Sequence, residues 1–155
     1  MHVSPAGRAM IERFEGCRLT AYKDIVGVWT IGYGCTGPAV HVGEMITQAQ
    51  ADDMLSTRLA NEFEPGVLKA FGNAPTTQGQ FDAMVSLAFN IGVHGFAGSS
   101  VARLHKLGKY DEAADAFLLW DKAGGRVVEA LSRRRAEEGQ MYLDASPTSC
   151  HTDPL

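Results

Sequence analysis

The chain has 155 residues and a formal net charge of −4, and 45% of its residues are hydrophobic. This length is enough for one compact unit with a core, and this hydrophobic content excludes a disordered chain. No apolar run approaches the roughly 18 residues of a membrane-spanning helix, so membrane insertion is not expected.

The sequence contains no motif for a cofactor, a metal ion or a nucleic acid. Its five histidines are scattered, and there is no glycine-rich phosphate loop. The three cysteines lack the spacing of metal ligands, which predicts free thiols in a reducing compartment. We therefore expect neither cofactor nor metal, and no nucleic-acid partner.

Local signals predict a helix over residues 4–15. Ser4 is a typical N-cap, Pro5 suits the first helical position, and Gly16 marks the end of the helix. From residue 19 to residue 34 the hydrophobic period changes to two, which predicts a small antiparallel β element.

The rest of the chain is predicted to be helical. A capping box at Thr47 begins a helix that Pro65 should end, and a second box at Thr77 begins the most hydrophobic helix, which ends near Gly92. Three further helices are expected at about 100–107, 111–119 and 127–142, with glycines as breaks. The fold class is therefore α+β, mainly α, and residues 144–155 are expected to form a flexible tail.

Two acidic residues near the N-terminus suit glycoside hydrolysis, which needs one protonated and one ionised carboxyl group. Glu15 ends the first predicted helix, where the negative end of the dipole disfavours its charged form, as a general acid requires. Asp24 lies in a polar turn beside Lys23 and is expected to stay ionised. Spacing alone favours a plainer interpretation, a solvated glutamate at a helix end and an aspartate in a turn.

Motifs along the whole chain favour the catalytic interpretation of Glu15 and Asp24. Tyr22-Lys23-Asp24 and Thr30-Ile31-Gly32-Tyr33-Gly34 follow Glu15, and further motifs come downstream in order: Gln80-Phe81-Asp82-Ala83, Phe89-Asn90-Ile91-Gly92, Phe96-Ala97-Gly98-Ser99-Ser100, Tyr110-Asp111-Glu112-Ala113-Ala114, Trp120-Asp121-Lys122-Ala123-Gly124-Gly125 and Leu131-Ser132-Arg133-Arg134-Arg135. From about residue 11 to residue 142 the sequence resembles the phage-type lysozymes, the endolysin muramidases of glycoside hydrolase family 24.

The resemblance implies a lysozyme-like, two-lobed catalytic domain over residues 1–143. The small lobe would span about residues 17–50 and carry the β element. The helical lobe would contain the remainder, including the helix 4–15, with the active-site cleft between the lobes. The implied reaction is hydrolysis of the β-1,4 bond between N-acetylmuramic acid and N-acetylglucosamine in peptidoglycan, for host cell lysis.

The resemblance also assigns roles to residues. Glu15 would be the general acid, while Asp24 and Thr30 would position or activate the attacking water, with inversion at the anomeric carbon. Thr36, Phe89 and Ser99 match positions that bind the glycan, although core packing would also explain Phe89, which lies on the apolar stripe of its helix.

Three other positions draw expectations from the resemblance. Arg126 falls where relatives can place an arginine against the catalytic glutamate, and Trp120 is expected to anchor the C-terminal lobe. Cys35 departs from the family, which usually has a histidine there that serves a structural ion pair. The triple arginine 133–135 fits a solvated helix face or a local basic cluster equally well.

The expected partners are peptidoglycan glycan strands, and the expected state is a monomer. Because the N-terminus lacks a signal-peptide core, we expect accumulation in the host cytoplasm and passage to the periplasm after holin-type opening of the inner membrane. Two alternatives remain. A lytic transglycosylase would not need Asp24 and Thr30, and a non-catalytic glycan-binding protein would not need Glu15 and Asp24.

Overall fold

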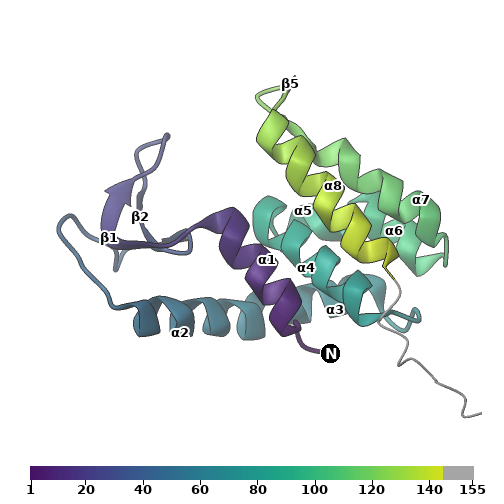
Figure 1. Ribbon diagram of the computed structural model, residues 1–155, viewed down its shortest axis with the longest axis horizontal. Helices are drawn as coiled ribbons and strands as arrows, with labels where there is room; N and C mark the ends of the chain where they lie inside the picture. The colour runs from purple at the N-terminus through teal and green to yellow at the C-terminus, as the bar shows by residue number, and fades with distance from the viewer. Residues whose placement is uncertain (145–155) are drawn as a thin grey trace, which may run out of the picture.

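The computed structural model describes residues 1–144. A three-stranded sheet lies at one end of the molecule, and most of the helices gather at the other (Figure 1). Helix α1 lies between these two parts, and α2 runs from the side of the sheet toward the helical part. This arrangement confirms the predicted class, which is mainly helical with a small antiparallel sheet. The tail predicted for residues 144–155 falls, apart from Asp144, outside the described residues.

The helices within the described chain begin with α1 before the sheet and continue from α2 to α8 after it. They are α1 (Pro5–Glu15), α2 (Gln48–Arg58), α3 (Glu64–Phe71), α4 (Gln78–Ile91), α5 (Val93–Ala97), α6 (Ser100–Lys106), α7 (Tyr110–Ala116) and α8 (Glu129–Leu143), with a π-helical turn η1 (Leu59–Phe63) and a 3-10 turn η2 (Phe117–Trp120). The short helix α5 was not predicted from the sequence.

The three-stranded sheet contains β1 (Arg18–Lys23), β2 (Trp29–Gly32) and β3 (Cys35–Thr36), in that order and antiparallel. Its register places Thr30 between Tyr22 on β1 and Thr36 on β3. A second hairpin, β4 (Lys122–Ala123) with β5 (Arg126–Val127), lies just before α8, where the sequence predicted only a glycine break.

The predicted capping residues of α1, α2 and α4 are confirmed. The Ser4 side chain accepts a hydrogen bond from the backbone of Gly7, and Pro5 opens α1. Gly16 follows the helix with φ of 65°, a conformation that glycine adopts without a steric penalty. Both predicted capping boxes, at Thr47 and at Thr77, are present in full.

Pro65 does not end a helix, so this prediction was wrong. The helical chain continues from α2 through η1 into α3, and Pro65 occupies the first turn of α3. A proline inside an α-helix has no N–H to donate and clashes with the carbonyl four residues earlier. The π-helical turn accommodates the ring, because the N–H of Glu64 bonds to the carbonyl of Leu59, five residues back.

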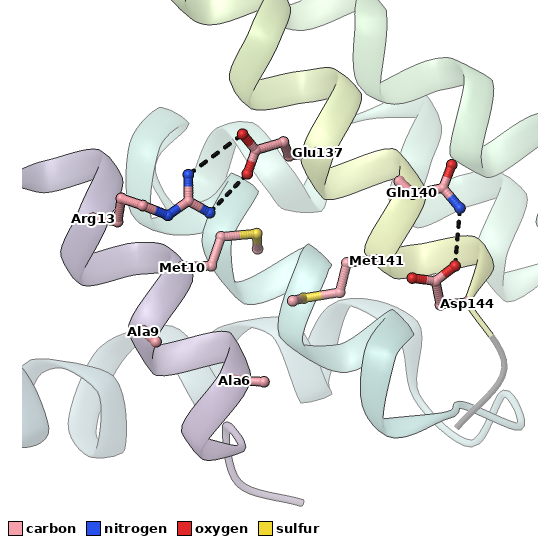
Figure 2. Close-up of a pocket in the computed structure, with 8 residues that line it drawn as sticks. All are labelled: Ala6, Ala9, Met10, Arg13, Glu137, Gln140, Met141 and Asp144. Carbon is pink, nitrogen blue, oxygen red and sulfur yellow. Dashed lines mark hydrogen bonds and ion pairs between the residues drawn. The ribbon is translucent and has the colours of Figure 1, made fainter. Parts of the chain in front are cut away.

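Helix α4 forms the centre of the helical part, since its residues from Gln80 to Phe89 are all buried. Helix α1 packs against it. The backbone N–H of Ser4 donates to Asp82 on α4 at 3.0 Å. Helix α1 also contacts α8. Arg13 of α1 forms a bidentate ion pair with Glu137 of α8, beside a groove between these two helices (Figure 2). These contacts link α1 to both α4 and α8.

Candidate active site

Glu15 is the last residue of α1, and its side chain is 19% exposed. Its Oε1 accepts a hydrogen bond from Nη1 of Arg134 at 2.8 Å. Its Oε2 lies toward Gly34, only 3.6 Å from the point where a Cβ atom on that residue would be. Gly34 has φ of 78°, so the turn after β2 brings its backbone close to the carboxyl without a side chain between them.

Arg134 is held on all three of its nitrogen atoms and is only 6% exposed. Its Nε donates to Glu138 on the next turn of α8 at 3.0 Å, and its Nη2 donates to the backbone carbonyl of Ser86 at 3.1 Å. Its guanidinium carbon also lies 5.0 Å from the ring centre of Phe14. The orientation of Arg134, and with it that of Glu15, is therefore fixed by α4 and α8.

The sequence placed the wrong arginine beside Glu15. Arg126, expected there from the resemblance, is exposed on β5, whereas Arg134 makes the contact. The solvated interpretation of the triple arginine fits Arg133 only, because Arg134 and Arg135 are buried. Local spacing gave no signal for this difference, because Arg133 also has a glutamate, Glu137, four residues further along.

Asp24 and Thr30 both form hydrogen bonds to one residue of the β1–β2 hairpin, Val28. The N–H of Val28 donates to Oδ1 of Asp24 at 2.9 Å, and the N–H of Val26 donates to the same oxygen at 3.0 Å. The carbonyl of Val28 accepts from the backbone of Asp24 at 2.9 Å and from the hydroxyl of Thr30 at 3.0 Å. The turn therefore orients the Asp24 carboxyl, and both Asp24 and Thr30 form hydrogen bonds to Val28.

The hydrogen bonds leave specific atoms available for a ligand. Oδ2 of Asp24 has no hydrogen-bond partner among residues 1–144. Because the Thr30 hydroxyl donates its proton to Val28, its lone pairs can only accept, as they would from a water molecule. Thr30 is 4% exposed, so access to it is narrow.

The three residues matched to glycan contacts lie in different environments. Thr36 is exposed on β3, directly across from Thr30. Phe89 is 9% exposed and packs on Phe63, with ring centres 4.6 Å apart. Ser99 is the N-cap of α6, where its hydroxyl accepts from the backbone of Ala102 and donates to a neighbouring carbonyl. Of the three, Thr36 alone is open to a ligand without rearrangement, and the glycan roles of all three stay predictions.

Arg58, at the end of α2, was not singled out in the sequence. Its guanidinium carbon lies 4.7 Å from the ring centre of Phe89 and 5.3 Å from that of Phe63. Within the described chain, the guanidinium group of Arg58 forms no ion pair and no hydrogen bond. Arg58 thus covers the two rings with a cation, an arrangement that a linear pattern does not reveal.

The remaining expectations concern Cys35, Trp120, metals and membranes. Cys17 and Cys35 are free thiols, and Cys150 lies outside the described residues. Trp120 is half-buried and packs at the edge of the core. Residues 1–144 hold no cluster of side chains suited to a metal ion. Across the same residues, none of the helices has both the length and the apolar character needed to cross a membrane.

The geometry supports acid–base chemistry on a ligand that lies between the end of α1 and the β1–β2 hairpin. Glu15 has one carboxyl oxygen bound by Arg134 and the other directed toward the glycine turn. Asp24 has one oxygen fixed by backbone N–H groups and the other without a partner in the described part of the chain. The two carboxyl groups are thus held in different ways, and glycoside hydrolysis uses a pair of carboxyl groups.

The chain is similar to known proteins over most of its length. The family model described as "Phage lysozyme" matches residues 12–138. The endolysin of Salmonella phage P22 is 42% identical over 141 residues, which cover 88% of this chain and 95% of that protein. The endolysin of Bacillus phage B103 is 38% identical over 145 residues, and the chain spans 54% of that protein's length. Among solved structures, the endolysin from Escherichia coli O157:H7 phage FAHEc1 superposes with a TM-score of 0.85 at 36% identity, covering 93% of this chain and 94% of that one.

Proposed function

Because the chain belongs to the phage lysozyme family, we propose that it is an endolysin that cleaves the glycan strands of bacterial peptidoglycan. The bond would be the β-1,4 linkage between N-acetylmuramic acid and N-acetylglucosamine. The observation that carries the proposal is the state of Glu15. This carboxyl is 19% exposed, is fixed at one oxygen by Arg134, and presents the other oxygen toward the turn after β2.

In the proposed reaction, Glu15 donates its proton to the glycosidic oxygen as the bond to the anomeric carbon breaks. A water molecule attacks that carbon from the opposite side of the sugar and gives up a proton to Asp24. After the step Glu15 is ionised and Asp24 is protonated. Arg134 stabilises the charge of Glu15 until solvent restores its proton, and Asp24 returns its own proton to solvent. The products are two shorter glycans, and the configuration at the anomeric carbon is inverted.

The hairpin contacts support the proposed position of the attacking water. A water molecule that donates one hydrogen bond to Thr30 Oγ1 and the other to Asp24 Oδ2 has both of its protons engaged. Its lone pair is then free to face the sugar. The contacts of Asp24 and Thr30 with the same residue, Val28, support this arrangement.

Mass analysis of fragments released from purified peptidoglycan sacculi tests the proposed reaction. Hydrolysis yields fragments with a reducing end, so their masses include one added water molecule per cleaved bond. A lytic transglycosylase would instead release anhydro-muramic products. A non-catalytic glycan-binding protein would sediment with the sacculi and release nothing.

The proposed route to the cell wall is opening of the inner membrane by a separate holin-type protein. The full chain would be expressed in a Gram-negative host, and culture turbidity would be followed before and after permeabilisation with chloroform. We expect the cells to stay intact until permeabilisation and to lyse afterwards. Lysis without permeabilisation that stops when the secretion machinery is inhibited would contradict this route.

A further inference from the structure

The carboxylate of Glu138 lies inside the protein, with no solvent-exposed surface. Its Oε1 accepts hydrogen bonds from the Ser86 hydroxyl at 2.7 Å and from Arg134 Nε at 3.0 Å. Its Oε2 forms an ion pair with Arg135 Nε at 2.9 Å. A buried carboxylate is costly unless it is paired in this way, so its place beside two buried arginines calls for a role.

Glu138 and Glu15 bind opposite sides of the same guanidinium. Arg134 donates from Nε to Glu138 and from Nη1 to Glu15, and its remaining nitrogen is held by Ser86. The second arginine, Arg135, contacts Glu138 on the far side and reaches Asn90 on α4 at 2.9 Å. One side chain, Arg134, therefore lies between Glu138 and Glu15 and contacts both carboxyl groups.

The cluster contains two arginines and two glutamates, so its formal charge is zero when both carboxyls are ionised. When Glu15 takes up a proton, the charge becomes +1, and Glu138 alone then opposes the two arginines. Burial raises the pKa of Glu138, whereas Arg135, Arg134 and the Ser86 hydrogen bond act in the opposite direction. The net effect is a raised pKa, but ion pairs at 3.0 Å with Arg134 and at 2.9 Å with Arg135 favour the ionised carboxylate.

We propose that Glu138 is a positioning residue that lets Glu15 hold its proton, because it balances the charge of Arg134 and Arg135. This inference rests on the proposed function, in which Glu15 must be protonated to act. Without Glu138, two positive charges would face Glu15 alone, and its ionised form would be favoured. The active form would then be lost at a lower pH.

Other charged groups around Glu15 have partners of their own. On α1, Glu12 pairs with Arg8, and Arg13 pairs with Glu137 of α8. From the hairpin, Lys23 lies over the ring of Trp29, and Asp24 is bound by backbone N–H groups. In the described chain, Arg134 is the only group that forms an ion pair with Glu15.

The test is the pH profile of kcat/KM on soluble glycan fragments for Glu138→Gln. The amide keeps the size of the side chain and removes its charge. We expect the alkaline limb of the profile to move to lower pH by about one unit, with activity at the acidic plateau largely retained. Glu137→Gln is the matched control, because Glu137 is the adjacent carboxylate and also binds an arginine, but its side chain is 47% exposed. The control should leave the limb where it is.

Two further variants keep the proposal open to refutation if Glu138→Gln does not fold. Arg135→Met removes one positive charge from the same cluster and should move the alkaline limb to higher pH. The double variant Glu138→Gln/Arg135→Met restores the charge balance and should return the limb to the wild-type position. A uniform loss of activity with an unmoved limb in these variants would overturn the inference and leave Glu138 with a packing role. If Glu15→Gln remained fully active, the proposed function itself would be wrong, independently of where the alkaline limb of the pH profile lies in the Glu138 and Arg135 variants.

Discussion

We predict that His105 makes the stability of the fold depend on pH in the acid range. Its ring has no exposed surface, and burial lowers its pKa from 6.5 to about 4. Thr76 donates its hydroxyl proton to the carbonyl of Ala74, so it can only accept from Nε2 of the ring. Nδ1 is then the acceptor for the Tyr142 hydroxyl at 2.6 Å. These contacts fix the neutral form of His105 with its proton on Nε2.

The direction and size of the effect follow from linkage. Between pH 6.5 and pH 4 the unfolded chain binds a proton at His105 that the folded chain does not. The stabilisation is therefore complete above pH 6.5 and is lost as the pH falls toward 4. Because one pKa unit corresponds to about 1.4 kcal/mol, the loss over this window is about 3 kcal/mol.

Urea unfolding at pH 7 and at pH 4 measures this contribution. The variant His105→Gln has no titrating ring, so its free energy of unfolding should depend less on pH than that of the wild type, by about 3 kcal/mol over this range. The variant will be less stable at pH 7, so the comparison is made within each protein. His94→Gln, at an exposed histidine, is the control. Equal pH dependence in His105→Gln and the wild type would refute the reasoning.

Three further predictions concern the hairpin and the glycan contacts. Thr30→Val keeps the shape and the β conformation but removes the hydroxyl, so it should reduce kcat by orders of magnitude with little change in melting temperature. Thr30→Glu places a carboxylate near the anomeric carbon and should trap a covalent glycan adduct, which intact-protein mass spectrometry would detect. If Thr30→Val stayed active and Thr30→Glu formed no adduct, Thr30 would have only a structural role in its strand. Ser99→Ala removes the N-cap of α6 and should lower the free energy of unfolding by about 1 kcal/mol, with KM unchanged. A raised KM at unaltered stability would instead indicate a glycan contact.

The features that the sequence predicted well are those set by neighbours in the chain. Ser4, Pro5 and Gly16 bound α1 because capping involves residues within one turn. The same holds for the capping boxes at Thr47 and Thr77. Since Glu15 is the residue before Gly16, its position at the end of α1 followed from these signals.

The features that the sequence did not predict depend on contacts between distant segments. Arg134 lies 119 positions from Glu15, and no local pattern distinguishes it from Arg133, which faces solvent. The rule for proline predicts a helix end at Pro65 because it considers α-helical geometry, and the π-helical turn avoids the clash. The buried position of Ser99 likewise follows from how α6 packs, which its local sequence leaves open.

The most direct test of the central claim is wall lysis by Glu15→Gln. The amide keeps the size of the side chain and cannot donate the proton of a carboxylic acid. Turbidity loss of permeabilised Gram-negative cells measures activity, and circular dichroism checks that the fold is intact. The account predicts a folded protein with lysis abolished. Lysis within about tenfold of the wild type, a difference in barrier of under about 1.4 kcal/mol, would contradict Glu15 as the essential acid.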